Sequence, residues 1–302
     1  MSDEETVELI LTADANLSNI VFIEDCITQA PKLEGWDFKA LKPASDIKDI
    51  VIEIGGNTFD EKSLYFYPTD NKDYPDEIEI TVVCDDFEEK EKGKVTSGVY
   101  LFLENCLGEL RFATTIDILN IETKQETIGK ELIPIEKLKS YLIWREKEYR
   151  EKYGEIEEST EKDNYSLLKG ELPNGKPLFA IINTTALEWE KKSSCPFITV
   201  LYIDYSEANE NLESGLPTTP VADNLDQIED QVWEILRSKK GHLSIGRETA
   251  DNTRKIYFAS SEFRYISKVV YDVIEKYQDK FEMSYEIYMD KYWQSFERFE
   301  IH

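Results

Sequence analysis

The chain has 302 residues, of which 62 are acidic and 35 are basic, so its formal net charge is −27 at pH 7. At about 100–200 residues per domain, this length predicts two domains. The hydrophobic content of 41 % argues against a globally disordered chain. The charge argues against sequence-independent binding to nucleic acid or to an anionic membrane, because lysine and arginine neutralise phosphates. The two histidines, His242 and His302, are too few for a histidine-rich metal centre.

The N-terminus is acidic and shows no basic stretch followed by an apolar one, so no secretory signal is expected. No run reaches the roughly 18 apolar residues that a membrane-spanning helix needs. The four cysteines lie far apart without a C-x-x-C pair, which argues against a zinc site or a catalytic thiol. Cys26 and Cys106 fall on apolar faces of expected helices, where cysteine acts as a small hydrophobe. We therefore expect a cytoplasmic protein without a metal or a cofactor.

The first half alternates between strand-like and helix-like patterns. Apolar residues at 3-4-3 spacing predict a helix over 18–30, and Val99, Phe102, Leu103 and Cys106 on one face predict a second helix over 95–107. Alternating or β-branched runs predict strands at 8–14, 36–41, 63–67, 77–84 and 109–118. The order β-α-β-β-β-α-β predicts a ferredoxin-like plait with one extra strand.

Residues 134–163 predict a boundary between two domains. The helical pattern over 135–153 ends in almost continuous charge, and residues 154–163 have no periodicity. We therefore expect an N-terminal domain over 1–133, a charged helix and linker over 134–163, and a second domain over 164–302. Residues 1–160 carry a net charge of −19, against −8 for residues 161–302.

The second half predicts the same plait behind an N-terminal hairpin. The hairpin strands are expected at 165–172 and 177–184, around a turn at 173–175. Further strands are expected at 197–205, 242–247, 253–259 and 282–289, with helices over 224–236 and 262–277. The predicted fold class is therefore α+β, with two tandem βαββαβ-type plaits whose sheets are mostly antiparallel.

Several short stretches of the second half follow one another in a recognisable order. They are 175–183, Gly215-Leu216-Pro217, Ile228-Glu229-Asp230, Gly246-Arg247 with Thr249, the strand 254–258, and Asp290 to Trp293 followed by Phe296. In this order and spacing, residues 164–302 resemble DUF695, a prokaryotic family of unknown function. One departure is Ala259, which stands where another aromatic residue is expected.

The resemblance implies no reaction. The first half resembles an uncharacterised domain that often precedes DUF695 in bacterial proteins. The plait is also similar to that of an acidic inhibitor, regulator of ribonuclease activity B, at the level of the fold alone. The roles of Gly215, Leu216, Pro217, Glu229, Gly246, Asp290 and Trp293 stay open between function and architecture.

The sequence contains no convergent catalytic set. Neither His242, at the start of a strand, nor the terminal His302 is placed as a base for a nucleophile. Glu229 and Asp230 are adjacent on a helix and point about 100° apart, so they do not converge on one substrate. The acidic turn over 70–77 lacks the frame of a calcium loop, and a charged hairpin tip explains it equally well.

Two kinds of function remain. The first is a non-catalytic binding or regulatory protein that engages a protein partner through an acidic surface, to which a basic partner would be complementary. Its docking candidates are Asp85, Asp86, Glu88 and Glu89, although acidic residues before a helix also favour the helix dipole.

The alternative is an enzyme or a small-molecule-binding protein with a pocket between the domains. There Arg247 and Arg254, with Thr249, would bind an anionic ligand; cross-strand pairing of the arginines with Glu or Asp is the structural alternative. A homo-oligomer formed through open sheet edges is a third reading.

Overall fold

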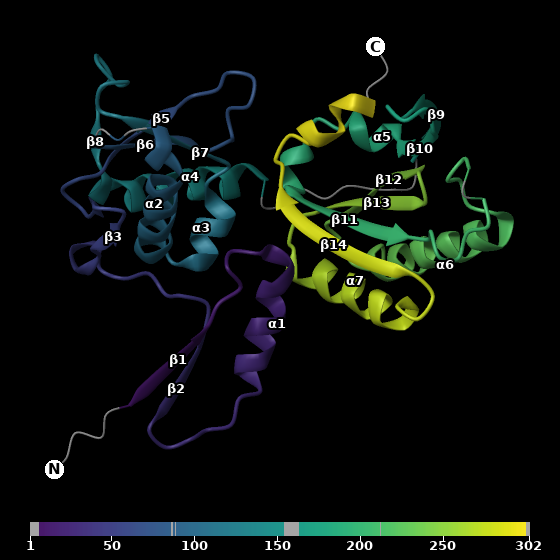
Figure 1. Ribbon diagram of the computed structural model, residues 1–302, viewed down its shortest axis with the longest axis horizontal. Coiled ribbons are helices and arrows are strands. Elements are labelled where there is room, and N and C mark those ends of the chain that lie inside the picture. Colours follow the sequence, from purple (N-terminus) through teal and green to yellow (C-terminus); the bar gives the residue numbers. More distant parts are fainter. Residues whose placement is uncertain (1–5, 86, 88, 154–162, 212, 300–302) are drawn as a thin grey trace. The chain divides into compact units, whose positions relative to one another are not determined.

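The computed structural model describes residues 6–85, 87, 89–153, 163–211 and 213–299 (Figure 1). The chain divides into two compact units, Met1–Lys152 and Tyr153–His302. Both units combine helices with open sheets, and the strand pairs of the chain are mostly antiparallel, so the chain is of the α+β class, as predicted. None of the described helices is both long enough and apolar enough to cross a membrane.

The first unit begins with a small βαβ segment. Strands β1 (Val7–Leu11) and β2 (Trp36–Ala40) form a two-stranded parallel sheet, and helix α1 (Leu17–Thr28) connects them. The side chain of Asn16 caps α1 by accepting a hydrogen bond from the backbone N–H of Ser18 (3.0 Å). Cys26 on α1 is exposed, so its predicted place on an apolar face was wrong.

The rest of the first unit contains a two-stranded and a four-stranded sheet. The first consists of β3 (Ile52–Ile54) and β4 (Asn57–Phe59). The second has the order β7-β6-β5-β8, formed by β5 (Tyr65–Thr69), β6 (Glu79–Cys84), β7 (Ile118–Thr123) and β8 (Ile133–Pro134). The helices of this part are α2 (Lys92–Leu107), α3 (Glu109–Thr115) and α4 (Leu138–Tyr153). The predicted face of α2 is buried in the core together with residues of β5 and β6.

The structure corrects two predictions for this unit. The strands of the first half lie in three separate sheets rather than in one. The predicted strand over 109–118 is wrong, because Glu109–Thr115 is helix α3 and the strand begins at Ile118. Tertiary bonds stabilise this short helix: its last residue, Thr115, donates to Glu146 of α4 (2.5 Å), and Arg111 pairs with the same carboxylate (3.0 Å).

The second unit has one six-stranded antiparallel sheet of order β14-β11-β13-β12-β10-β9. Its strands are β9 (Tyr165–Glu171), β10 (Pro177–Asn183), β11 (Phe197–Asp204), β12 (His242–Ala250), β13 (Thr253–Ser260) and β14 (Glu282–Met289). Its helices are the short α5 (Thr184–Leu187), α6 (Thr219–Leu236) and α7 (Arg264–Tyr277). The predicted strands and the two long helices of this half are confirmed, although α6 begins five residues earlier than expected.

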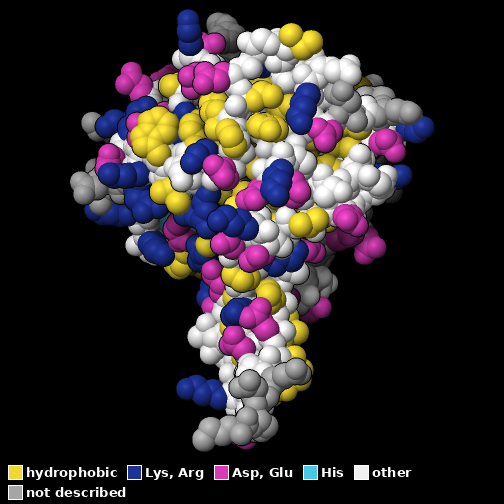
Figure 2. All heavy atoms as spheres, turned by 90° about the vertical axis from the view of Figure 1, so that its left-hand side faces the viewer, with side chains coloured by type: hydrophobic (Ala, Val, Ile, Leu, Met, Phe, Trp, Pro, Cys, Tyr) yellow, Lys and Arg dark blue, Asp and Glu magenta, His cyan; other side chains and the backbone are white. Residues whose placement is uncertain are grey.

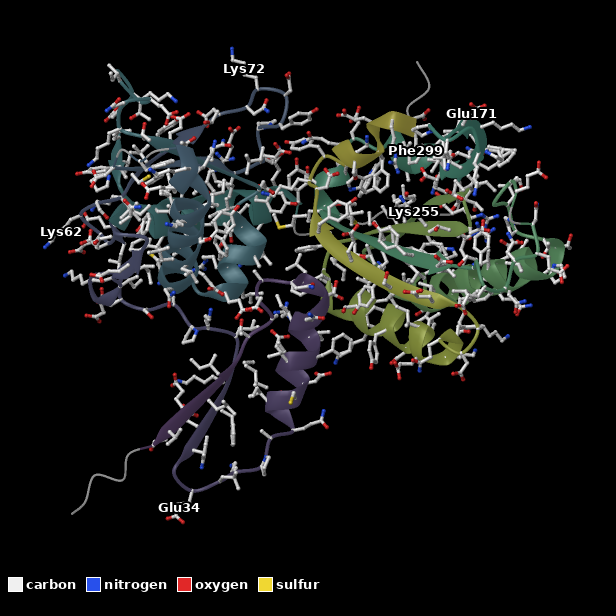
Figure 3. The ribbon with its side chains drawn as sticks, viewed as in Figure 1. Glu34, Lys62, Lys72, Glu171, Lys255 and Phe299 are labelled. Carbon is white, nitrogen blue, oxygen red and sulfur yellow. The ribbon has the colours of Figure 1, made fainter. Side chains whose placement is uncertain are left out.

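The two faces of this sheet have different covers. Helices α6 and α7 lie along one face (Figure 1), and their apolar residues Leu225, Ile228, Val232, Ile266 and Val270 are buried. A 3₁₀ helix, η5 (Gln294–Phe299), packs against Tyr257 and other residues of the opposite face. Figure 3 shows Phe299 of η5 and Lys255 of β13 in the second unit.

Candidate functional site

Four charged side chains converge between helix α6 and the sheet of the second unit. Arg247 of β12 bonds Glu229 (2.6 Å between Nη1 and Oε2), and Arg254 of β13 bonds Asp226 (2.6 Å between Nη1 and Oδ1). Each arginine also lies within 4 Å of the other carboxylate. Thr249, which is paired with Arg254 in the sheet register, accepts a hydrogen bond from Arg254 Nε (3.2 Å). We call these five residues the charge cluster.

Burial differs across the charge cluster. The Arg254 side chain is 6 % exposed, whereas that of Asp226 is 48 % exposed, so the cluster reaches solvent at Asp226. Burial raises the pKa of Glu229, and the neighbouring arginines offset only part of this effect. Two cations and two anions sum to zero, so the cluster is neutral when all four groups are ionised.

The structure brings together the three residues that the sequence nominated for an anionic ligand, Arg247, Arg254 and Thr249. Both arginines are already paired with carboxylates, and an incoming anion would have to displace one of them. The predicted cross-strand pairing was wrong, because these carboxylates come from helix α6 and not from a neighbouring strand. Sequence reasoning missed Asp226 as a partner. The signal was present, because residues three apart on a helix lie on one face, as Asp226 and Glu229 do. Asp230 is exposed, whereas Glu229 belongs to the charge cluster.

The four acidic docking candidates of the first unit are only partly described. Asp86 and Glu88 lie outside the described residues, and Glu89 begins a short 3₁₀ helix, η2 (Glu89–Glu91). Asp85 follows β6 with a side chain that is 73 % exposed, and it pairs with Lys124 (2.7 Å). Their role in docking a partner stays a prediction.

The Gly215-Leu216-Pro217 loop is held by backbone and side-chain bonds. The carbonyl of Gly215 accepts from the N–H of Asn252 (2.8 Å) and from the hydroxyl of Tyr205 (2.9 Å). The buried amide of Asn209 donates to the carbonyl of Leu216 (3.0 Å). Gly215 has φ +67°, and a Cβ there would lie 2.7 Å from the Cα of Asp251. These contacts give Gly215 and Leu216 an architectural role, and Pro217 continues the same loop.

Other residues of the family pattern also have architectural contacts. Trp293 is buried and donates from Nε1 to the carbonyl of Cys195 (3.0 Å). The carboxylate of Asp290 accepts from the backbone N–H groups of Gln294 and Ser295 (both 2.9 Å) and so starts η5. Gly246 lies at a β-bulge in β12. Within the family pattern, Glu229, Arg247 and Thr249 differ from these residues because they belong to the charge cluster.

His242 is buried and is not placed as a base for an accessible nucleophile. Its Nδ1 lies 2.8 Å from the hydroxyl of Ser260, which is itself fully buried, and its ring lies 5.4 Å from that of Tyr265. Burial lowers the pKa of His242 to about 4, so the ring is neutral at physiological pH. His302 lies outside the described residues.

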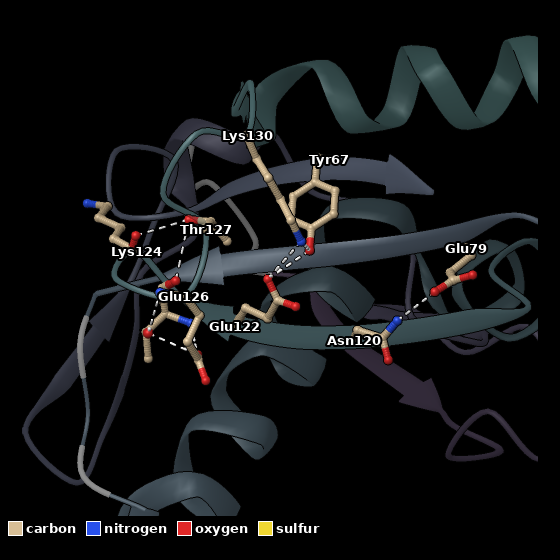
Figure 4. Close-up of polar contacts among 9 residues, drawn as sticks. Tyr67, Glu79, Asn120, Glu122, Lys124, Glu126, Thr127 and Lys130 are labelled. Atoms are coloured by element: carbon tan, nitrogen blue, oxygen red, sulfur yellow. Dashed lines mark hydrogen bonds and ion pairs between the residues drawn. The ribbon is translucent and has the colours of Figure 1, made fainter. Parts of the chain in front are cut away.

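A second polar network lies on the four-stranded sheet of the first unit (Figure 4). The hydroxyl of Tyr67 donates to Glu122 (2.7 Å), and the ammonium group of Lys130 contacts both side chains. The hydrogen bond to Tyr67 raises the pKa of Lys130. Nearby, Asn120 donates to Glu79 (3.0 Å). The network connects β5, β6 and β7 to the loop that follows, and each of its charged groups has a partner.

The acidic turn over 70–77 is tied to helix α4. Lys152 bonds the carboxylate of Asp76 (2.8 Å), and Arg145 donates to the backbone carbonyls of Pro75 and Glu77. Within the part of the chain that the structure describes, no group of three or more His, Cys, Asp or Glu side chains is placed to hold a metal ion.

Comparison with known proteins adds one finding. No curated protein and no solved structure matches the chain. One family model matches residues 171–299, described as a family of unknown function, DUF695. The matched range includes the charge cluster and all the stretches of the sequence pattern, which run from Gly175 to Phe296. Residues 171–299, in the C-terminal half of the chain, thus match the family that the sequence pattern resembles, DUF695.

Proposed function

We propose that this protein is a non-catalytic binding or regulatory protein of the cytoplasm, which engages a basic protein partner through the acidic surface of its first unit. The observation that carries the proposal is the charge of that unit. Residues 1–152 contain 34 acidic and 18 basic residues, a net charge of −16. A charge of this size attracts a basic partner over about one Debye length and accelerates the encounter.

Exposed carboxylates support this proposal. The Asp70 and Asp85 side chains are 91 % and 73 % exposed. Figure 2 shows Asp and Glu interspersed with Lys and Arg on one face of the molecule. The attraction therefore rests on the excess of acidic residues over the unit, with Asp85, Asp86, Glu88 and Glu89 as the local docking candidates.

The burial and pairing of the side chains that are chemically best suited to catalysis support a non-catalytic role. A nucleophile needs a base within reach and an exposed reacting atom. Ser260 has His242 beside it, but both are buried. The arginines of the charge cluster are neutralised within the fold.

The finer fold proposal concerns the second unit. Its elements β11-α6-β12-β13-α7-β14 and the strand order β14-β11-β13-β12 support a ferredoxin-like plait, with β9 and β10 as the added hairpin. The similarity to the ribonuclease regulator is an analogy of fold, and it makes a nucleic-acid-processing enzyme one class of partner to examine.

The experiment that tests this function uses the intact chain as bait in a native lysate. Captured proteins are identified by mass spectrometry, and the affinity of the purified partner is then measured by calorimetry at two salt concentrations. We expect affinity to fall at least about tenfold between about 50 and about 300 mM NaCl, because the attraction is electrostatic. Salt-independent binding would contradict the proposal.

A charge reversal locates the surface. Asp85→Lys with Glu89→Lys should weaken binding, because both changes add positive charge at the docking candidates. Asp272→Lys with Glu275→Lys, two exposed changes on α7 of the second unit, adds the same four positive charges and is the control for net charge. Equal losses from the two sites would contradict docking at β6 and η2.

The second candidate function is binding of a small anion at the charge cluster. Asp226 favours it, because a half-exposed carboxylate bonded to Arg254 is the group that an anion could replace. Binding of phosphate or a dicarboxylate should raise the melting temperature of the wild type and leave that of Arg247→Met unchanged. An equal shift in both proteins would exclude the charge cluster as the site.

A further inference from the structure

The parallel sheet of the βαβ segment has a free edge on each strand. Among the described residues, β1 pairs only with β2, and β2 only with β1. Large apolar side chains of this segment are exposed, with Trp36 at 46 %, Val7 at 49 % and Leu33 at 51 %. Hydrophobic side chains are visible on the surface of this segment in the lower part of Figure 2.

A sheet of this kind is incomplete on physical grounds. Two-stranded sheets are marginal in water, and parallel strands normally lie inside larger, covered sheets. An open edge presents unpaired backbone groups that pair readily with another strand. The question is which strand completes the sheet.

The sequence of β2, Trp36-Asp37-Phe38-Lys39-Ala40, is complementary to itself in an antiparallel arrangement. A two-fold axis through Phe38 places each Phe38 opposite its symmetry mate. It also places Asp37 opposite Lys39 and Trp36 opposite Ala40. Each copy thereby gains opposite charges across the strands and an aromatic pair of the two Phe38 rings, both favourable in cross-strand pairs.

The other edge lacks this property. The same operation through Leu9 of β1 places Glu8 opposite Ile10 and Val7 opposite Leu11, with no opposite charges. The charged residues of the segment therefore favour the edge of β2.

The charges within one copy point to the same partner. In the register of the parallel sheet, Glu8 lies directly opposite Asp37, which is an unfavourable like-charge pair. The two carboxylates share one cation: Lys39 bonds Glu8 and lies 3.5 Å from Asp37. Antiparallel pairing brings a second Lys39, from the other copy, next to Asp37.

We propose that two copies of this chain associate through β2, forming a continuous four-stranded sheet of order β1-β2-β2-β1. The interface is isologous, so each residue meets its partner twice. Trp36, Phe38 and Ala40 of both copies share one face of this sheet, because alternate residues of a strand point to the same side.

Sedimentation velocity over a concentration series tests the proposal, with charge variants to define the register. We expect wild-type dimers, and a dissociation constant at least about tenfold higher for Asp37→Lys and for Lys39→Asp, since each variant places like charges opposite each other twice. An equimolar mixture of the two variants restores opposite charges at both positions and should dimerise like the wild type. Asp272→Lys should behave like the wild type, and far-UV circular dichroism establishes that each variant is folded.

A disulfide provides a second measurement that does not depend on charge. In a Cys26→Ser background, Phe38→Cys should form an intermolecular disulfide, because opposed antiparallel residues have Cα atoms about 4.5–5.5 Å apart. Trp36→Cys, which faces Ala40, should form much less. A wild type that stays monomeric up to about 100 µM overturns the proposal. So does dimerisation that Asp37→Lys leaves intact, or a mixture of variants that stays monomeric.

Discussion

Gly246 lies at a position of the sheet where no side chain fits. Its φ is +136°, and a Cβ there would lie 2.1 Å from the carbonyl oxygen of Ile181 on the neighbouring strand. The obstacle is backbone in a central sheet, so it cannot rotate away. We expect Gly246→Ala to lower the free energy of unfolding by about 2–4 kcal/mol, measured by urea unfolding.

Gly170→Ala is the matched control, because it makes the same chemical change in the same sheet. Gly170 lies on the edge strand β9, and its added Cβ would meet only Leu178 Cδ2 at an ordinary 3.7 Å. Its effect should stay within about 1 kcal/mol of zero. Equal effects of the two substitutions would show that the bulge tolerates a side chain.

Glu229 gives a prediction on pH. Its pKa is raised mainly by burial, so ionisation is less favourable in the folded than in the unfolded chain. Its contribution to stability is complete below the unfolded value, near pH 4.3, and is lost as pH rises through the folded value. Glu229→Gln cannot ionise. The stability of the wild type relative to this variant, measured by urea unfolding, should therefore fall as pH rises above the unfolded pKa; a constant difference would contradict the raised pKa.

The sequence predicts three members of the charge cluster but not the carboxylates with which the arginines pair. Arg247, Thr249 and Arg254 were identified because they follow one another on adjacent strands. Their carboxylate partners lie 18 and 28 positions away on α6. The rotation of that helix over the sheet decides which acids meet the arginines, and it depends on packing of the whole unit. The sequence alone could therefore leave only the choice between a bound anion and an internal carboxylate.

At the scale of elements, Glu109 connects the βαβ segment to helix α3. Its buried carboxylate accepts from the backbone N–H groups of Ala13 (2.7 Å), Lys42 (3.0 Å) and Ala15 (3.1 Å). Burial alone would raise the pKa of Glu109, but the backbone hydrogen bonds outweigh it and lower the pKa. The stability that the ionised Glu109 contributes through these hydrogen bonds is therefore fully present above the ordinary pKa of a glutamate. It is lost as pH falls through the lowered pKa of the folded state.

Glu109→Gln should loosen this segment without unfolding the rest of the unit. The amide replaces one acceptor oxygen by a donor that faces other donors, a loss of about 2–3 kcal/mol. Hydrogen exchange should accelerate at the amides of β1 and β2 and stay unchanged in β5 and β6. Glu53→Gln, an exposed change on β3, is the control. Uniform acceleration over the first unit would contradict a local anchor.

The same glutamate explains where the element prediction failed. Residues 109–118 alternate like a strand, but Glu109 is drawn into a helix N-terminus by donors about 67 to 96 positions away. Long-range bonds of this kind override local pattern. The helices and strands of the second half were predicted correctly because they have strong periodicity, although its sheet pairs strands that are distant in sequence, such as β11 with β14. In the first half, the local pattern does not show that β1 and β2 form a separate sheet.

At the scale of the whole molecule, like charges oppose compaction. The acidic and basic residues leave −27 on one chain, with −16 in residues 1–152 and −11 in residues 153–302. Ion pairs such as Lys152–Asp76 and Arg254–Asp226 reduce this repulsion only locally. The surplus carboxylates are brought closer together on folding, so the folded state is more repulsive than the unfolded chain.

Screening should therefore stabilise the protein. We expect its melting temperature, measured by scanning calorimetry, to rise by at least about 2 °C when NaCl increases from about 10 to about 200 mM, over which the Debye length shortens from about 30 Å to below 10 Å. Glycine at the same osmolality, a zwitterion that adds nothing to the ionic strength, is the control and should produce a smaller shift. If ion pairs outweighed the repulsion, salt would lower the melting temperature instead, because screening weakens exposed pairs as well. A rise of the melting temperature with salt would show that the surplus acidic charge destabilises the folded state. A cost of this kind is expected of charge that serves to bind a basic partner rather than to stabilise the fold.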